Sequence, residues 1–346
     1  MMLFAAVLLS LALSPTPQQL SDLRLHDGFT LKYQVTVQDV RTAVLREQQV
    51  VDQQNGIKKR VAEGHMTPSQ AEMYQTQALT LGKHQADEHF TITLSAWDGK
   101  LLYLSTRNGT KLNDGSGQAI VLDGALEYEA DGPMNGMINA DGWKSAPVYS
   151  GENVDRLAFC PLPGVGLPGV DLVQQPIRAG TTPDGHTHFR GRVPLLNVGG
   201  TDPVYKIGEI DTVSVGGHLR VVSLLVGAPA VPLEDWKMSG FRLFQDHWIA
   251  AQMQMTEYEG ALASDEEPLP SNLPLYVNTY TLLEAKPEAR ESAAFGIETY
   301  LTKGADVFDT IGNNSRSFIY EPLGGTVKEQ AEASAKKESE KDLKTP

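Results

Sequence analysis

Residues 90–106, FTITLSAWDGKLLYLST, carry the pattern that decides the fold class of this protein. In the first half, apolar residues alternate with threonine and serine from Phe90 to Ala96, the period-two pattern of a strand with one buried face. Asp98-Gly99 tolerates the left-handed backbone that a two-residue hairpin turn requires. The returning strand is apolar at consecutive positions 101–104, so both of its faces need cover. These residues predict an antiparallel hairpin within a packed sheet.

The same combination of strand pattern and turn residues recurs along most of the chain. Consecutive strands with short turns and few helices between them exclude a doubly wound parallel sheet and favour an antiparallel meander. We therefore expect an α+β, β-dominated fold built on a large antiparallel sheet. Besides the opening pair, the expected strands are 29–37, 119–122, 125–130, 204–215, 219–226, 241–244, 248–258, 275–283, 305–309 and 316–321.

Residues 40–88 interrupt the strand pattern and predict a helical hairpin inserted into the sheet. The segment is rich in glutamine, and its single proline, Pro68, suits the first position of a second helix. Thr67 precedes this proline, and Gln70 completes a Thr-x-x-Gln capping box. The apolar positions of the first helix start at Val40, and the chain turns between the two helices just before Thr67.

The first 17 residues differ in character from the rest of the chain. Their apolar run ends at Pro15 and Pro17 and is too short to cross a membrane, which takes about 20 residues. We expect a signal peptide, with a buried N-terminal helix as the alternative. The mature protein would then be exported to the periplasm or the cell exterior, soluble and without a transmembrane segment.

The remainder is expected to form one domain with a short tail. Residues 18–325 form a single β-rich domain that contains the hairpin at 40–88, because strand patterns resume on both sides of each irregular stretch. Residues 134–169 and 229–235, rich in proline and glycine, are expected as long loops or short helices over the sheet. Residues 326–346 combine many charges with small side chains and predict a charged tail, either helical or disordered.

The charge of the protein argues against one class of partner. The chain has 29 Lys and Arg against 43 Asp and Glu, a formal net charge of -14. A nucleic-acid-binding protein needs a basic face, so nucleic acid is excluded as a partner. The hairpin and the tail are each balanced in charge, and the acidic excess therefore belongs to the sheet-rich body.

Local motifs for catalysis or metal binding each have a simpler interpretation. The G-x-G-x-x-G sequence at 164–169 follows two prolines rather than a strand, so a tight loop is favoured over nucleotide binding. His186 and His188 are candidate metal ligands, but Asp184 beside them suggests a polar hairpin tip. The single cysteine, Cys160, cannot form an internal disulfide, and a buried thiol is the ordinary interpretation. The acidic run 265–267 is expected to be a solvated loop.

No catalytic signature in the sequence supports an enzyme. A G-x-S-x-G elbow, a Walker loop and an H-E-x-x-H helix are all missing from the sequence, and no cofactor is implied. A hydrolase with a dispersed site around Asp184, His186 and His188 is a further hypothesis, because distant residues leave no local pattern.

Two apolar strands are the candidates for a ligand-binding surface. Ile249, Met253 and Met255 share one face of the expected strand 248–258, and Leu102 and Leu104 share one face of the other. As an alternative, helices or loops cover these side chains and make them part of the core. The binding hypothesis places them in a groove for an acyl chain, to which flexible methionines adapt well.

A resemblance to a known family adds to this interpretation. The chain resembles the periplasmic lipoprotein-carrier superfamily, LolA/LolB-like, and its large secreted members of uncharacterised function. One feature of the resemblance is the order of export signal, strand, helical insertion and long meander. The others are the segment 295–320 (FGIETYLTKGADVFDTIGNNSRSFIY) and the loop 161–168 (PLPGVGLP). The resemblance spans about residues 22–325. It implies a curved, unclosed antiparallel β-barrel, helices across its concave side and a cavity for a hydrophobic ligand.

Two functions therefore stand ahead of a dispersed hydrolase. The first is an exported binding or carrier protein for a hydrophobic ligand, a lipid or an acyl chain, held in a concave cavity of the sheet. The alternative is an envelope structural or interaction protein that docks a protein partner through the hairpin at 40–88.

Overall fold

The computed structural model describes residues 28–98, 100–107, 117–123, 126–140, 174–195, 204–216, 218–228, 231–258, 273–310 and 316–342. The expected signal peptide, Cys160, the glycine-rich residues 164–169 and the acidic run 265–267 lie outside these residues. Among the residues that are described, no helix combines the length and the apolar character needed to span a bilayer.

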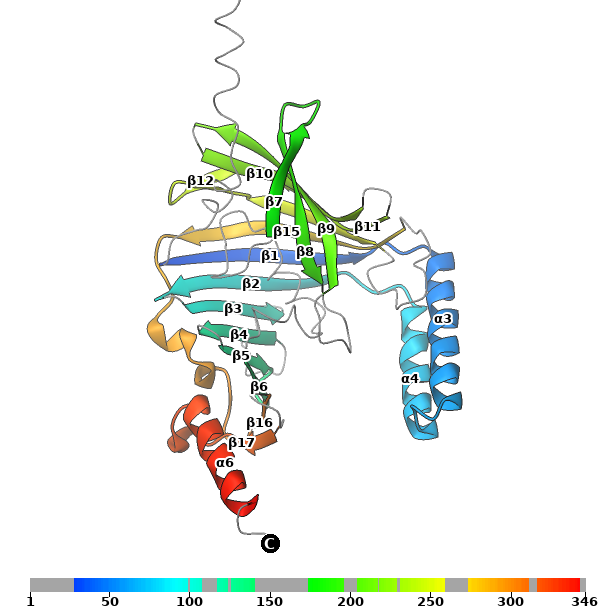
Figure 1. Cartoon of the computed structure of the whole chain (residues 1–346), viewed down its shortest axis with the longest axis vertical. Helices are drawn as coiled ribbons and strands as arrows, with labels where there is room; N and C mark the ends of the chain where they lie inside the picture. The colour runs from blue at the N-terminus through cyan, green and yellow to red at the C-terminus, as the bar shows by residue number, and fades with distance from the viewer. Residues whose placement is uncertain are drawn as a thin grey trace, which may run out of the picture.

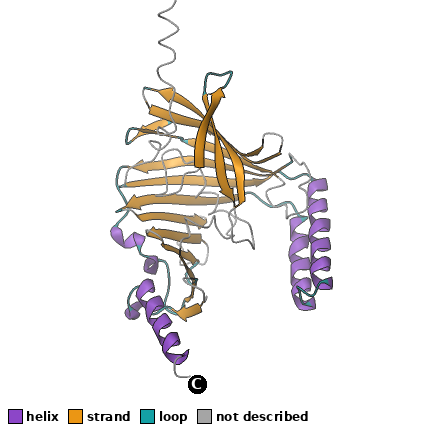
Figure 2. Cartoon of the chain, viewed as in Figure 1, coloured by secondary structure: helices purple, strands orange, loops and turns teal. Residues whose placement is uncertain are grey.

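One 15-stranded sheet forms most of the described structure (Figures 1 and 2). The order of its strands is β17-β16-β6-β5-β4-β3-β2-β1-β15-β14-β11-β10-β9-β8-β7. The strands are β1 (Phe29–Asp39), β2 (Glu88–Trp97), β3 (Lys100–Arg107), β4 (Gly117–Asp123), β5 (Leu126–Asp131), β6 (Asn135–Ala140), β7 (Gln174–Thr181), β8 (Thr187–Leu195), β9 (Val204–Val215), β10 (His218–Ala228), β11 (Val231–Ser239), β14 (Gln252–Tyr258), β15 (Pro274–Lys286), β16 (Asp306–Asp309) and β17 (Arg316–Ile319).

The topology of this sheet confirms the expected fold class. β1 pairs with β2 on one side and β15 on the other, and both pairings are antiparallel. The meander β2–β6 continues from one side, while β15, β14 and β11–β7 continue from the other. The pairing of β16 with β6 is parallel. Because β17 and β7 remain at opposite edges, the sheet is curved but not closed (Figure 1).

Two segments that were expected to be long loops or short helices contain strands. Residues 134–169 include β6, where Gly136 allows close packing: a Cβ on this residue would lie 3.1 Å from Val307 Cγ2. Residues 229–235 overlap β11, whose Pro232 lies opposite Gly227 where the register of β10 and β11 shifts. Proline is accepted in a sheet at such an irregularity, so the prolines and glycines in these segments were misleading.

The expected strand 248–258 is divided in two. β12 (Arg242–Phe244) and β13 (His247–Ile249) form a separate two-stranded sheet, and the chain enters the main sheet again only at β14. Gln245 and Asp246 form the turn between β12 and β13, and both have positive φ, 47° and 62°. Ala250 and Ala251 connect the two sheets, so the alternating pattern of this segment does not correspond to one strand.

The helical hairpin is confirmed, with a later start than expected. It consists of α3 (Ala43–Ala62) and α4 (Pro68–Leu81). Val40 follows the end of β1 and is still bonded to the sheet, because its amide donates to the Leu275 carbonyl at 3.1 Å. The cap of α3 is Thr42, which accepts a hydrogen bond from the amide of Leu45. The predicted capping box at Thr67 and Gln70 is present at the start of α4.

The sheet carries a hydrophobic core on each of its two faces. Leu101 and Tyr103 of β3 belong to the first core, whereas Leu102 between them belongs to the second. The expectation that this strand is covered on both sides is therefore confirmed. The second core is covered by η2 (Ser292–Phe295), η3 (Ile297–Thr299), the residues that follow them and α6 (Val327–Asp342), with η4 (Pro322–Gly324) just before this helix. The first core contains one side chain from each of five adjacent strands in a single row, namely Phe189, Ile210, Leu224, Trp236 and Met255.

Candidate functional site

The sheet separates the five side chains that the sequence suggested for ligand binding. Ile249, Met253 and Met255 lie in the first core, and Leu102 lies in the second, with Leu104 packed against it. Four of the five side chains are buried, and Leu104 is partly buried. They cannot line a single site, because the backbone of the sheet lies between the two groups.

The methionine face is packed tightly. Met253 pairs across strands with Met238 and Tyr280, and Met255 pairs with Trp236. The rings of Trp236 and Tyr280 stack with their centroids 5.6 Å apart. Met255 and Trp236 are both 0% exposed. Aromatic and thioether side chains fill this part of the first core.

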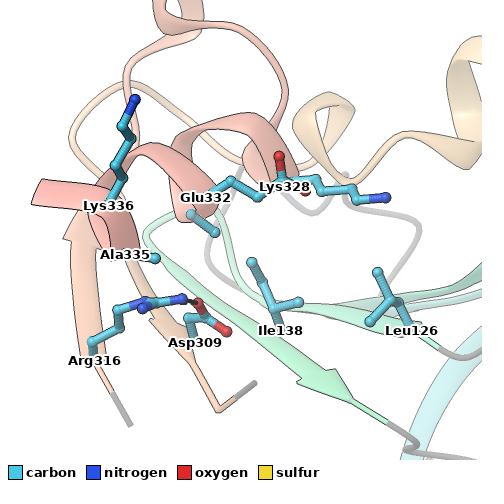
Figure 3. A pocket seen from close by; sticks show the side chains of 9 residues that line it. Leu126, Ile138, Asp309, Arg316, Lys328, Glu332, Ala335 and Lys336 are labelled. Atoms are coloured by element: carbon cyan, nitrogen blue, oxygen red, sulfur yellow. Dashed lines mark hydrogen bonds and ion pairs between the residues drawn. The ribbon is translucent and has the colours of Figure 1, made fainter. Parts of the chain in front are cut away.

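A cavity of about 700 Å³ lies on the opposite face, between α6 and the sheet (Figure 3). We call it the α6 groove. Its floor is formed by Leu126 of β5 and Ile138 of β6, and its roof includes Ala331 and Ala335 of α6. The complete lining is Leu126, Ile138, Asp309, Arg316, Lys328, Ala331, Glu332, Ala335 and Lys336.

The groove exists because α6 covers an apolar surface with small side chains. After Val327, the helix has no apolar residue larger than alanine. Val327 is 1% exposed and Ala331 is 4% exposed, so the first turns touch the second core. Further along, Ala335 is too short to fill the space above the floor. Side chains that line an unfilled space lose dispersion contacts, and an apolar ligand can supply them.

The N-terminal end of α6 is held by a dense set of hydrogen bonds. Thr326 and Glu329 form a capping box, in which the Glu329 amide donates to Thr326 Oγ1 at 3.2 Å and the Thr326 amide donates to Glu329 Oε2 at 2.7 Å. These hydrogen bonds from Thr326 hold the pKa of Glu329 below its usual value. The Val327 amide also donates to Glu298 Oε1 at 2.7 Å. The helix is therefore fixed at its start.

One end of the α6 groove carries a buried ion pair. Asp309 of β16 is 0% exposed, and Arg316 of β17 donates to its Oδ2 from Nε at 2.9 Å and from Nη2 at 2.7 Å. The two residues lie opposite each other in the β16–β17 pair, so strand register brings them together. Figure 3 shows Lys336 at this same end, and Lys328 and Leu126 at the other.

The floor near β5 is also shielded from water. Tyr128 lies in the second core, and burial, followed by the negative charges of Asp123, Glu298 and Glu332, raises the pKa of its phenol to about 12. The phenol therefore stays neutral at any physiological pH.

The two histidines near the expected hairpin tip make different contacts. The tip is confirmed, since the Thr182 amide donates to the His186 carbonyl at 2.9 Å and Gly185 has a φ of 81°. His188 Nδ1 lies 2.7 Å from Asp211 Oδ1, across the β8–β9 pair. Within the described parts of the chain, no three His, Cys, Asp or Glu side chains are grouped so that they could hold a metal ion.

A serine also joins this histidine cluster, but in the wrong place for catalysis. Ser223 Oγ donates to Asp211 Oδ2 at 3.0 Å, so Asp211 lies between the serine and His188. In a catalytic triad the histidine takes the central position, because it removes the proton from the serine. Asp184, the third residue of the dispersed hydrolase hypothesis, is exposed in the turn. This arrangement is a cross-strand polar network.

Sequence reasoning did not find the α6 groove. Its residues come from four strands and the terminal helix, and none of them forms a motif. The available signal was indirect: residues 326–346, predicted as a charged tail that is helical or disordered, contain small side chains that cannot fill an apolar surface that they cover. The position of that surface under the helix follows from the parallel pairing of β16 with β6.

The comparisons with known proteins concern the fold. No protein-family model and no curated protein matches this sequence. The structure is similar to that of a LolA superfamily protein from Nitrosomonas europaea, with a TM-score of 0.41 and 9% identity, over 82% of this chain and 98% of the other. It is also similar to a DUF1329 family protein from Desulfovibrio piger, with a TM-score of 0.41 and 8% identity, over 82% of this chain and 95% of the other. The first of these belongs to the superfamily that the sequence resembles.

Proposed function

We propose that this protein binds a hydrophobic ligand, a lipid or an acyl chain, as an exported binding or carrier protein. The observation that supports this function is the α6 groove, which has an apolar floor, an alanine-lined roof and charged groups at its rim. Its volume of about 700 Å³ lies within the range of sites for small ligands, roughly 300–1,000 Å³. In this proposal the ligand binds on the face of the sheet opposite to the methionines.

The proposal is tested by filling the groove from its roof. Ala335→Leu adds an apolar side chain to the lining, whereas Ala333→Leu adds the same atoms to an exposed position of the same helix. Binding of methyl laurate, the neutral methyl ester of a twelve-carbon fatty acid, is measured by equilibrium dialysis. We expect the first variant to bind about tenfold more weakly or worse, because the added side chain occupies the site of the ligand.

The control variant should bind methyl laurate as the original protein does. No measurable binding by the original protein, or equal binding by both variants, would sink the proposed function. Unfolding midpoints in urea show whether each variant is folded, and filling a cavity with an apolar side chain is not expected to lower them strongly.

A second candidate function is the docking of a partner protein through the hairpin of α3 and α4. Figure 1 shows the hairpin projecting away from the sheet. It carries large apolar side chains in water: Val44 is 77% exposed, Leu79 is 57% exposed and Met73 is 50% exposed. Exposed apolar side chains on a projecting element are typical of contact surfaces.

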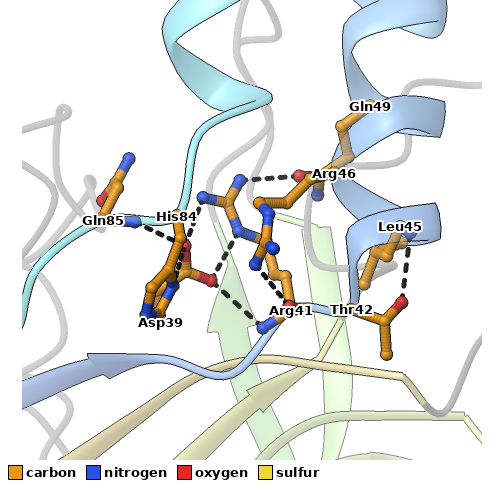
Figure 4. A network of polar contacts seen from close by, with 8 residues as sticks. All are labelled: Asp39, Arg41, Thr42, Leu45, Arg46, Gln49, His84 and Gln85. Carbon is orange, nitrogen blue, oxygen red and sulfur yellow. Dashed lines mark hydrogen bonds and ion pairs between the residues drawn. The ribbon is translucent and has the colours of Figure 1, made fainter.

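The junction between hairpin and sheet is rigidly bonded (Figure 4). Asp39, at the end of β1, accepts hydrogen bonds from Arg41 Nε and Nη2, each at 2.9 Å, and from the amide of Gln85 at 3.0 Å. Arg41 Nη1 donates to Gln49 of α3 at 2.8 Å. The bonds link the strand to both ends of the insertion, so the hairpin is held in a fixed direction.

The docking hypothesis is tested with glutamine substitutions on the hairpin. Val44→Gln combined with Leu79→Gln removes exposed apolar surface, and Thr76→Ala on the exposed face of α4 is the control. A partner that co-purifies from envelope extracts of the native host should be lost with the double variant and kept with the control. Equal recovery with both variants would contradict docking through the hairpin.

A further inference from the structure

We propose that the α6 groove selects single-chain anionic amphiphiles and binds their carboxylate or phosphate head group at the Arg316 end. This inference rests on the proposed function and names the class of ligand. The acyl chain then lies over Ile138 and runs toward Leu126 at the other end (Figure 3).

The first argument is the charge of the lining. The whole chain carries a net charge of -14, yet the groove is lined by three cationic side chains and two acidic ones. Arg316, Lys336 and Asp309 lie at one end of the groove. Lys328 and Glu332, one helical turn apart on α6, complete the charged part of the lining. A cationic site within an acidic protein is the arrangement that attracts an anion locally.

The second argument is the hydrogen-bonding capacity of Arg316. A guanidinium has five N–H donors, and Arg316 directs one from Nε and one from Nη2 to Asp309. In the described part of the chain, no further hydrogen bond of its side chain is found, and the side chain keeps 18% exposure. Its remaining donors can therefore pair with carboxylate or phosphate oxygens, the acceptors for which the planar guanidinium is best suited.

The third argument is the fixed position of this guanidinium. The fully buried Asp309 holds Arg316 from the adjacent strand, so the arginine does not need to be ordered when a ligand binds. Preorganised groups bind more tightly because less conformational entropy is lost. An apolar floor next to one preorganised polar group matches the chemistry of an amphiphile with a single charged head.

The test compares ligands that differ only in the head group. Binding of laurate, dodecyl phosphate and neutral methyl laurate is measured by equilibrium dialysis below their aggregation limits. We expect the two anions to bind about tenfold or more tightly than the ester, with a difference that shrinks as salt is added. The ratio of the dissociation constants of laurate and dodecyl phosphate shows which head group the site prefers.

Paired variants localise the head group. Arg316→Gln combined with Asp309→Asn removes both charges without leaving one buried alone, and should abolish the preference for anions. Lys336→Gln should weaken the binding of laurate about two- to fivefold, and Glu332→Gln should strengthen this binding by a similar factor. Lys337→Gln is the control, because Lys337 is exposed and lies outside the lining. None of these changes should alter binding of methyl laurate.

The outcomes separate the inference from the function on which it rests. If the ester binds as tightly as the anions, or if the Arg316→Gln, Asp309→Asn variant keeps the preference, the anionic head-group site is wrong and hydrophobic binding stands. If no ligand binds, or if Ala335→Leu has no effect on any of them, both proposals fail.

Discussion

At the scale of single residues, Asp39 is a buried charged group at the end of β1. Its side chain is 1% exposed, as is that of Arg41, with which it forms an ion pair. Burial by itself raises the pKa of Asp39, but hydrogen bonds from the Arg41 side chain and from the amides of Gln85 and Arg41 outweigh it. The net pKa is held well below the usual range, so the folded state favours the charged carboxylate.

Asp39→Asn should therefore destabilise the protein strongly. The change leaves the Arg41 guanidinium buried without its counter-ion, which costs about 3–5 kcal/mol. Urea denaturation at pH 7 measures the loss of unfolding free energy. Asp52→Asn is the control, because Asp52 is an exposed acceptor on α3, and its effect should stay within about 0.5 kcal/mol. Equal effects of the two substitutions would contradict the role assigned to Asp39.

The same carboxylate predicts how stability depends on pH. A group whose pKa is lower in the folded state stabilises the protein fully above its unfolded pKa of about 3.9. The contribution is lost as the pH falls from there toward the folded value. The difference in unfolding free energy between the original protein and Asp39→Asn should thus be constant above about pH 5 and should shrink below pH 4. A difference that stays the same down to pH 3 would be inconsistent with the lowered pKa.

At the scale of elements, helix caps are the features that the sequence defines most sharply. The start of α4 is bonded by Thr67 and Gln70 alone, with the Gln70 amide 3.3 Å from Thr67 Oγ1 and the Thr67 amide 3.0 Å from Gln70 Oε1. These contacts are local in the sequence, so the pattern Thr-Pro-x-Gln was sufficient to predict them. The start of α3 was less clear, because Val40 is bonded to Leu275, a residue far away in the sequence.

Thr67→Ala should loosen α4 locally. The substitution removes the side-chain acceptor at the cap, which costs about 1 kcal/mol, within a range of roughly 0.5–2. Native-state hydrogen exchange of the α4 amides measures the change as faster exchange in the first turns. Thr76→Ala in the middle of the same helix serves as the control and should not accelerate exchange, because alanine favours helix. Unchanged exchange in the Thr67 variant would show that the cap does not limit the opening of α4.

At the scale of the whole molecule, β1 occupies a central position in the sheet and joins its two halves. Leu31 of this strand is 0% exposed in the first core, and it pairs with Leu94 of β2 and Ala285 of β15. The meander β2–β6 and the returning strands β14 to β7 are therefore connected through one buried strand from the start of the domain.

Leu31→Ala should lower the stability of the whole sheet. Truncating a fully buried leucine costs about 2–5 kcal/mol through lost burial and the cavity left behind. Leu283→Ala on β15 is the matched control, because Leu283 is 52% exposed and its loss should change stability by no more than about 0.5 kcal/mol. Both values come from urea denaturation followed by tryptophan fluorescence. Similar losses for the two variants would contradict the assignment of the core.

The sequence by itself determined the antiparallel, β-dominated class, most strand pairs and the helical hairpin. These features depend on alternation of side chains and on turn and cap residues, which act over fewer than about ten residues. The same local reasoning failed where proline and glycine fit a strand because of a distant neighbour: Gly136 packs beside Val307, and Pro232 lies at an irregularity opposite Gly227.

Only the tertiary structure decided which apolar faces are filled and which leave space. Leu102 and Met255 are both apolar strand residues, yet they lie on opposite faces of the sheet, because register and sheet curvature assign each strand face to a core. The α6 groove follows from the parallel pairing of β16 with β6, which places an alanine-rich helix over Ile138. Periodicity shows that a strand is apolar on one face. Whether another group covers that face depends on contacts between segments far apart in the chain, which no local pattern records.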